Sequence, residues 1–343
     1  MSVVPPSILA AYGWSDAAIT PITIGLINQT FRVETASRAR FVLQRLHPVF
    51  AAEVNLDIDA ITTHVEARGL TTPRLVHTRE SSTHVMDEEA RPWRALTFVD
   101  GRCVTEFRSA SLARAAGALA GRFTRATFDL DHRFAFTRSG VHDTAAHLAR
   151  LARALESRRT DENAEALSIA AEILAHARDL PRVDHLPTRI VHGDLKASNL
   201  LFAHDRDEGI CLVDLDTMAH GTLATEMGDA LRSWTNPKGE DDARGEVDVS
   251  LFEAAVSGYL AETEGLLTND ERRAFAPGLE TIALELSSRF CLDAIEDRYF
   301  GWNAAKYPSR RAHNVVRARS QLSLSRSTRD RRAELDAIVA RLS

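Results

Sequence analysis

The stretch "IVHGDLKASNLLF", residues 190–202, sets a polar segment between two apolar runs. His192, Asp194 and Asn199 follow the spacing H-x-D-x-x-x-x-N, and Asp214 comes 15 residues after the asparagine, at the end of a second apolar run. Asp and Asn that serve only as turn formers between two strands would also explain the first stretch. The two carboxylates and the amide are, however, the set that phosphoryl transfer requires. One group must accept the proton of a hydroxyl, while oxygen ligands hold Mg²⁺.

The sequence before this stretch reads as a small antiparallel sheet with one inserted helix. Residues 21–46 alternate in the manner of two strands joined by a turn at 37–39. Apolar residues in the segment 54–65 recur at intervals of four, three and four, which predicts an amphipathic helix that Gly69 ends. Three further short strands are predicted at 74–78, 83–87 and 92–99.

From residue 109 onward the apolar period becomes helical, as Leu112, Ala116, Leu119 and Phe123 share one face of a helix. The runs at 190–202 and 209–217 then read as a small hairpin-like insertion among helices. We therefore predict an α+β fold of two lobes, a small antiparallel-sheet lobe and a mainly helical one. Their expected bounds are 1–99 and 104–343, with a hinge near 97–103.

The composition is that of an ordinary soluble protein, with 44% hydrophobic and 26% charged residues. The net charge of -6 argues against a nucleic-acid partner, although residues 298–343 carry 11 Lys or Arg against 3 Asp or Glu. The three cysteines lie far apart, which indicates neither a disulfide framework nor a zinc site. We expect a cytoplasmic protein without a membrane partner, as a monomer or a homodimer.

Several longer motifs resemble a known family. "HGDLKASN", "VDLDT" and "GTLATEMGDALRSW" are similar to the aminoglycoside phosphotransferase and choline kinase superfamily, whose fold is that of the protein kinases. "GLINQTFRV", "FVLQRLHPVF", "WRALTFVDG", "RFCLDAIEDRYF" and "YPSRRAHNVVRARSQLSL" most resemble the N-acetylhexosamine 1-kinases, which phosphorylate the anomeric hydroxyl of GlcNAc or GalNAc. The resemblance spans about residues 20–325 and implies ATP and Mg²⁺ as cofactors.

The resemblance assigns roles around the first stretch. It implies that Asp194 is the catalytic base and that Lys196 lies near the γ-phosphate, where a fixed cation stabilises developing charge. The implied metal ligands are Asn199, Asp214 and Asp216. His192 and Asp229 are expected to support the catalytic loop, although Asp229 could instead be a helix N-cap.

For the nucleotide, the implied phosphate loop comprises Gly25, Asn28 and Thr30, and the segment from Thr97 to Val99 would offer backbone groups to adenine. The strand "FVLQR" departs from the superfamily, which usually has a phosphate-binding lysine where this chain has Gln44 and then Arg45. Successive side chains point to opposite faces of a strand, so only one of the two can face the nucleotide. The sequence leaves that choice open, and Glu53 is the nearest carboxylate that could pair with the phosphate contact.

A cationic acceptor is disfavoured, because aromatic residues make up only 6% of the chain and its late region is basic. Arg289 and Asp293 are four residues apart, which predicts a pair on one helix face that binds sugar hydroxyls or is merely a surface ion pair. Tyr299 is a weaker candidate of the same kind. We expect a kinase for an N-acetylhexosamine or related sugar. The alternatives are a kinase for homoserine, an aminoglycoside or a choline-like alcohol, and an inactive nucleotide-binding regulatory protein.

Overall fold

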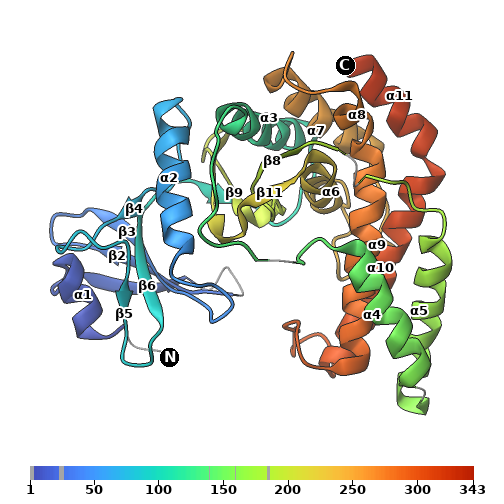
Figure 1. Ribbon diagram of the computed structural model, residues 1–343, viewed down its shortest axis with the longest axis horizontal. Coiled ribbons are helices and arrows are strands. Elements are labelled where there is room, and N and C mark those ends of the chain that lie inside the picture. Colours follow the sequence, from blue (N-terminus) through green and yellow to red (C-terminus); the bar gives the residue numbers. More distant parts are fainter. Residues whose placement is uncertain (1–3, 23–26, 139, 159, 184–185) are drawn as a thin grey trace.

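The computed structural model describes residues 4–22, 27–138, 140–158, 160–183 and 186–343 (Figure 1). Its N-terminal lobe is an antiparallel sheet in the order β1-β2-β3-β6-β4, with β5 also paired to β6. The strands are β1 (Ala18–Ile22), β2 (Gln29–Glu34), β3 (Arg40–Arg45), β4 (Leu75–Val76), β5 (Val85–Met86) and β6 (Pro92–Thr97).

The two faces of this sheet have different partners. Phe31, Leu43 and Trp93 lie on one face and form a buried core with α1 (Pro6–Tyr12). Because side chains alternate along each strand and Gln44 is paired in register with both Thr30 and Arg94, these three polar residues share the other face. That polar face is the one turned toward the rest of the molecule.

The predicted helix is confirmed as α2 (Val54–Ala67), whose Ile58, Ile61 and Val65 are buried. Gly69 has a φ of 81°. This is the left-handed conformation in which glycine commonly ends a helix. Figure 1 shows α2 standing between the sheet and the C-terminal part of the chain.

The C-terminal lobe is mainly helical, as predicted. Its helices are α3 (Ala110–Thr127), α4 (Thr144–Ser157), α5 (Ala164–Ala177), α6 (Leu223–Trp234), α7 (Val249–Glu262), α8 (Asn269–Arg273), α9 (Phe275–Glu296), α10 (Arg310–Asp330) and α11 (Arg332–Leu342). Together with the sheet of the first lobe, they confirm the α+β class.

The predicted hairpin-like insertion is confirmed for β9 (Leu200–Phe202) and β10 (Gly209–Leu212), which pair antiparallel, but β8 (Thr188–Val191), the start of the first run, pairs elsewhere. β8 pairs with β11 (Ala219–Thr222), while β9 also pairs with β7 (Arg102–Cys103). The polar segment 192–199 therefore joins two separate small sheets, which lie between α3 and α6 in Figure 1.

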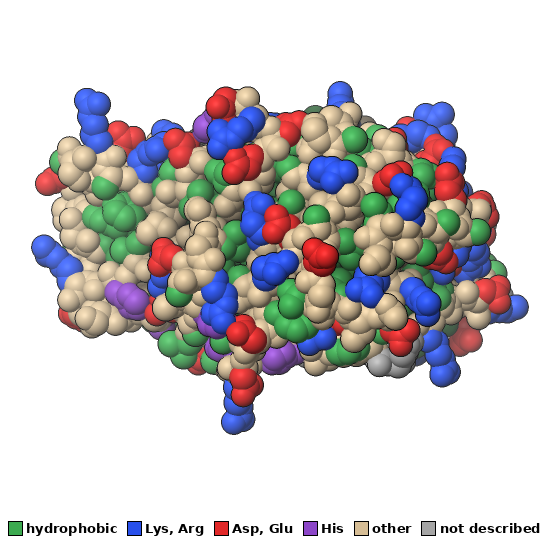
Figure 2. Space-filling view, turned by 90° about the horizontal axis from the view of Figure 1, so that it is seen from above, with side chains coloured by type: hydrophobic (Ala, Val, Ile, Leu, Met, Phe, Trp, Pro, Cys, Tyr) green, Lys and Arg blue, Asp and Glu red, His purple; other side chains and the backbone are tan. Residues whose placement is uncertain are grey.

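The surface carries charges of both signs. Basic and acidic side chains are interspersed over the face shown in Figure 2. Among the described residues, no helix combines the length and the apolar character that crossing a bilayer requires.

Candidate active site

The structure brings three predicted residues of the segment 192–199 together. The Oδ2 atom of Asp194 accepts hydrogen bonds from Lys196 Nζ at 2.5 Å and from Asn199 Nδ2 at 3.0 Å. The same Asn199 nitrogen donates to the main-chain oxygen of Asp194 at 2.8 Å, which leaves the amide oxygen as the atom that could coordinate a metal. Burial opposes the charge on Lys196, but the carboxylates of Asp194 and Asp214 outweigh it and raise the pKa of the lysine.

Asp214 lies on a neighbouring turn that is locked to this segment by its backbone. The N–H of Val213 donates to the main-chain oxygen of Asn199 at 2.9 Å, and the Thr217 hydroxyl donates to the main-chain oxygen of His192 at 2.9 Å. Asp214 itself has a φ of 67°, a left-handed conformation that is uncommon outside glycine. Burial, followed by the adjacent carboxylate of Asp216, raises the pKa of Asp214 to about 6.

The donor set of Asp214 and Asn199 fits a hard divalent cation. Mg²⁺ prefers oxygen ligands and is commonly held by one or two carboxylates together with substrate phosphates. Within the described ranges, no three His, Cys, Asp or Glu side chains converge into a complete metal site. The arrangement therefore suits a cation that arrives with part of its ligands supplied by a nucleotide.

Asp216 does not belong to this donor set, contrary to the prediction. Its side chain is fully buried, and both of its carboxylate oxygens accept hydrogen bonds from the guanidinium of Arg94. Asn28, predicted to offer a donor to phosphate, instead donates its Nδ2 to Asp216 at 2.7 Å and accepts the N–H of His47 at 2.9 Å. Asp216 thus joins the C-terminal lobe to the N-terminal lobe.

The structure resolves the choice between Gln44 and Arg45. Arg45 pairs with Asp87 and Glu89, at 2.8 and 2.7 Å, on the face of the sheet that is turned away from Asp216. The prediction of Arg45 as a phosphate contact is therefore wrong, because its charge is neutralised elsewhere. Gln44 accepts two hydrogen bonds from Arg94 and donates to the Thr30 hydroxyl at 3.2 Å.

Sequence reasoning missed Arg94, the cation that lies on the same face as Gln44. The partner expected on α2 is also different. Glu53 makes no side-chain capping bond, whereas the buried Asn55 accepts from Arg94 at 3.4 Å. A usable signal was the arginine within the apolar strand "PWRALTFV", because a charge in a buried strand needs a buried partner.

The remaining nucleotide predictions have mixed outcomes. Gly25 lies outside the described residues. The backbone N–H of Thr97 donates to the main-chain oxygen of Arg74 at 2.8 Å and is therefore not free for adenine, while its hydroxyl accepts the Arg74 N–H at 2.9 Å. Val99 follows β6 in an irregular link, where its backbone groups remain candidates.

Two buried side chains brace the segment 192–199. The ring of His192 donates from Nε2 to the Val213 oxygen at 3.0 Å, and burial lowers the pKa of this imidazole. Glu226, which sequence reasoning missed, accepts the backbone N–H groups of His192 and Gly193 at 2.8 and 2.9 Å. Both contacts are of the kind that a bracing residue makes.

Asp229 lies inside α6, and the N-cap of this helix is Thr222, so the N-cap alternative is wrong. Asp229 accepts from Arg232 at 2.8 Å. Burial opposes its charge, but Arg232 outweighs burial and lowers the pKa of the Asp229 carboxyl.

On the acceptor side, the predicted pair of Arg289 and Asp293 does not form. The buried Asp293 carboxylate accepts the backbone N–H groups of Arg298, Tyr299 and Phe300, at 3.1, 2.7 and 2.9 Å, and the amide of Asn314 at 2.8 Å. Four donors commit this carboxylate to the turn after α9, so its prediction as a substrate ligand is not supported.

Arg289 lies beside a second carboxylate, Glu285, at 3.8 Å. Glu285 also contacts His142 at 3.1 Å and accepts from the Thr144 hydroxyl at 2.6 Å. Burial disfavours the imidazolium of His142, but Glu285 outweighs burial and raises the pKa of the imidazole. Tyr299 is exposed, and its hydroxyl accepts from Arg138 at 2.6 Å.

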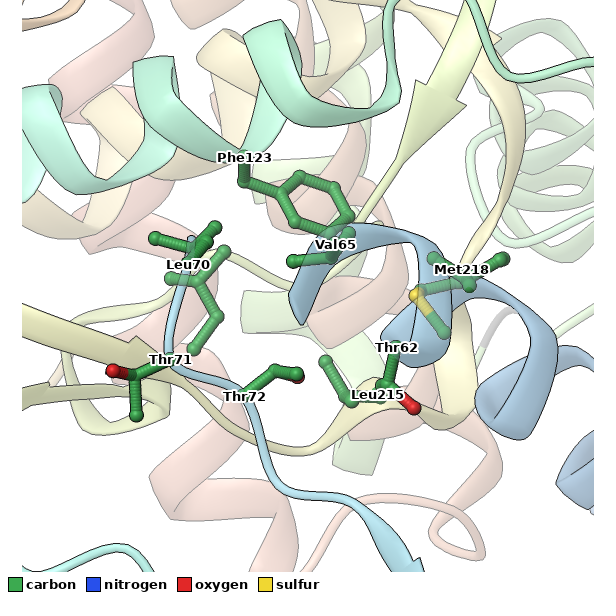
Figure 3. A pocket seen from close by; sticks show the side chains of 10 residues that line it. Thr62, Val65, Leu70, Thr71, Thr72, Phe123, Leu215 and Met218 are labelled. Atoms are coloured by element: carbon green, nitrogen blue, oxygen red, sulfur yellow. The ribbon is translucent and has the colours of Figure 1, made fainter. Parts of the chain in front are cut away.

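Apolar packing holds the Asp214 turn from behind. Leu215 and Met218 line a small cavity together with Val65 of α2 and Phe123 of α3, and Figure 3 shows these side chains facing one another. The turn is therefore packed against both lobes.

The model of the family described as "Phosphotransferase enzyme family" matches residues 18–263. Solved structures with the same fold include an amicoumacin kinase in complex with AMP-PNP and Ca²⁺, at 14% identity, a TM-score of 0.65, and coverage of 92% of this chain and 91% of that chain. A microcompartment-associated aminopropanol kinase has 15% identity, a TM-score of 0.65 and coverage of 98% of each chain.

An aminoglycoside phosphotransferase from Alicyclobacillus acidocaldarius has 16% identity and a TM-score of 0.63, with 100% of this chain and 97% of that chain covered. At these identities the likeness establishes the fold alone.

Proposed function

Because the chain belongs to the phosphotransferase enzyme family, we propose that it transfers the γ-phosphate of ATP, with Mg²⁺, to a hydroxyl of a small molecule. The acceptor we propose is the anomeric hydroxyl of an N-acetylhexosamine or a related sugar. The observation that carries the reaction type is the convergence of Asp194, Lys196 and Asn199 against the turn of Asp214.

In this proposal each side chain has a separate task. The Asp194 carboxylate accepts the proton of the attacking hydroxyl on Oδ1, because the hydrogen bonds from Lys196 and Asn199 both go to Oδ2 and orient the carboxylate. Lys196, whose Nζ lies 2.5 Å from Asp194 Oδ2, stabilises negative charge on the phosphoryl group during its transfer. The divalent cation, held by Asp214 and Asn199, would neutralise the phosphate oxygens.

The charges on the acceptor side support a neutral acceptor. A kinase for an ammonium-bearing alcohol needs a carboxylate that is free to pair with the substrate. Glu285 is already paired with His142, and Asp229 is already paired with Arg232. Each of these carboxylates therefore has a basic side chain of the protein itself as its partner.

An amine-bearing alcohol remains the second candidate. The solved structures with this fold include proteins named as aminopropanol, ethanolamine and choline kinases. Homoserine, an amino acid with a hydroxyl, belongs to the same class of alternatives. A catalytically inactive regulatory protein is a weaker alternative, because Asp194, Asn199 and Asp214 are all in place.

Phosphorus NMR with MgATP and a panel of acceptors tests the proposal. The panel comprises GlcNAc, GalNAc, free hexoses, homoserine, an aminoglycoside and choline, with the Asp194→Asn variant as the control for contaminating kinases. A new phosphorus signal coupled to the anomeric proton, present only with the wild type, is the expected result. Product from an amine-bearing alcohol alone would keep the kinase and refute the sugar acceptor.

A further inference from the structure

A buried ion pair joins the two lobes directly behind the Asp214 turn. The side chains of Arg94 and Asp216 are 1% and 0% exposed. Arg94 comes from the middle of the N-terminal sheet, and Asp216 comes from the turn that follows β10 in the C-terminal lobe. The pair therefore connects the two lobes directly.

All five N–H donors of the Arg94 guanidinium are in use. Nε and Nη2 donate to the Gln44 oxygen at 3.0 and 2.7 Å, and Nη2 also donates to Asp216 Oδ2 at 2.8 Å. Nη1 donates to Asp216 Oδ1 and to the Asn55 oxygen. A guanidinium has five donors in a fixed fork, so none is left over for a phosphate group. The guanidinium of Arg94 therefore binds side chains of the protein and not the nucleotide.

The Asp216 carboxylate is fixed by hydrogen bonds from two residues of the N-terminal lobe. Its carboxylate accepts from both Nη atoms of Arg94 and from Asn28 at 2.7 Å. It lies two residues after Asp214, within the single short turn Leu215–Thr217. Because only two residues separate Asp214 from Asp216, fixing Asp216 restrains the short stretch of backbone from which the Asp214 side chain extends.

We propose that Arg94 is a positioning residue for phosphoryl transfer. From the sheet of the N-terminal lobe it clamps Asp216, and through Asp216 it holds the Asp214 carboxylate where the metal–nucleotide complex binds. This inference rests on the function proposed above.

Geometry, more than stability, is what such a pair contributes. Removing two charges from water costs free energy that offsets much of their attraction, so a buried ion pair is often no more stabilising than apolar residues of the same size. A planar, two-pronged contact does, however, fix the relative orientation of the two groups. Lysine has no such fork and cannot reproduce this contact.

Isothermal titration with AMP-PNP, in the presence and absence of Mg²⁺, tests the inference without requiring the acceptor. The variants are Arg94→Met, Arg94→Lys, and the double variant Arg94→Met/Asp216→Asn, which removes the unpaired buried carboxylate. The matched control is Arg45→Met, which breaks two ion pairs made by the next arginine on the opposite face of the same sheet. Adenosine binding and the melting temperature are measured in parallel.

Residues that orient a metal ligand typically contribute about 10- to 100-fold to metal affinity or activity. The gain in AMP-PNP affinity that Mg²⁺ provides should therefore fall by on the order of tenfold or more in all three Arg94 variants. Adenosine binding should stay unchanged, and Arg45→Met should match the wild type.

Three outcomes would overturn the inference. The first is a folded double variant with the wild-type gain from Mg²⁺. The second is recovery of that gain in Arg94→Lys, which would mean that a positive charge suffices and that the two-pronged guanidinium contact is not needed. The third is an equal loss of adenosine and AMP-PNP affinity, which would mean a general structural role. Wild type that fails to bind AMP-PNP with Mg²⁺ would instead refute the proposed function itself.

Discussion

Replacing Gly193 by alanine tests how closely the catalytic loop must approach the Asp214 turn. Gly193 has a φ of 77°, and a Cβ atom there would lie 2.5 Å from the main-chain oxygen of Thr217. Thr217 is tied to the same loop through its hydroxyl, and the N–H of Gly193 is tied to Glu226. Neither backbone can therefore move away freely.

The magnitude has two parts. A left-handed alanine costs about 1–2 kcal/mol relative to glycine. An ordinary contact begins at 3.4 Å, so the two backbones must separate by 3.4 minus 2.5, or 0.9 Å. A displacement of about 1 Å at a catalytic group can lower the rate about 100-fold. We expect Gly193→Ala to lose about 2–4 kcal/mol of unfolding free energy and about two orders of magnitude in kcat.

Gly265→Ala is the matched control. Gly265 has a φ of 75°, but a Cβ atom there would meet nothing within 4 Å. It should lose only the backbone contribution of about 1–2 kcal/mol and keep its kcat. Urea unfolding and steady-state kinetics measure both variants. Equal stability and equal kcat in the two variants would refute the close approach of the loop and the turn.

Two further predictions concern His192 and Asp293. Burial lowers the pKa of His192 below its ordinary 6.5, although the carboxylates of Asp194 and Asp229 partly oppose this. Below pH 6.5 the imidazole therefore binds a proton more readily in the unfolded chain than in the folded protein. The contribution of His192 to the free energy of unfolding is thus complete above pH 6.5 and is lost as the pH falls. The difference in unfolding free energy between wild type and His192→Gln should shrink from pH 8 to pH 5.5, and a constant difference would contradict this account. Asp293→Ala should raise the KM of the acceptor and spare the KM of ATP, because it releases the turn that carries Tyr299; equal changes in both KM values would argue against this placement.

The parts that sequence predicted well are local. The helix at 54–65 follows from a single apolar period, and the proximity of Asp194 and Asn199 follows from their spacing on one short segment. The pairing of the Asp214 turn with that segment follows from two neighbouring strands, β9 and β10. Short separations leave the chain few alternatives, so the pattern alone is informative.

The contacts that sequence missed are distant along the chain. Arg94 and Asp216 are 122 residues apart, and no periodicity connects a strand of one lobe with a turn of the other. The prediction for Asp293 was wrong because the spacing along α9 shows only which face of the helix the residue lies on. Its actual partners are backbone N–H groups of the turn that follows the helix. Gln44 could be read only when the register between β3 and β6 placed it beside Arg94.

The rate of phosphoryl transfer by Asp194→Asn, compared with wild type at saturating MgATP, tests the central claim most directly. Asparagine keeps the shape of the side chain but cannot accept the proton, and a positioned base contributes about 10²–10⁴-fold. We predict a loss of that size in kcat, with the affinity for AMP-PNP and Mg²⁺ within about threefold of wild type, since the asparagine oxygen can still accept the hydrogen bonds from Lys196 and Asn199. A variant that retains wild-type kcat would contradict the assignment of Asp194 as the base and, with it, the proposed reaction.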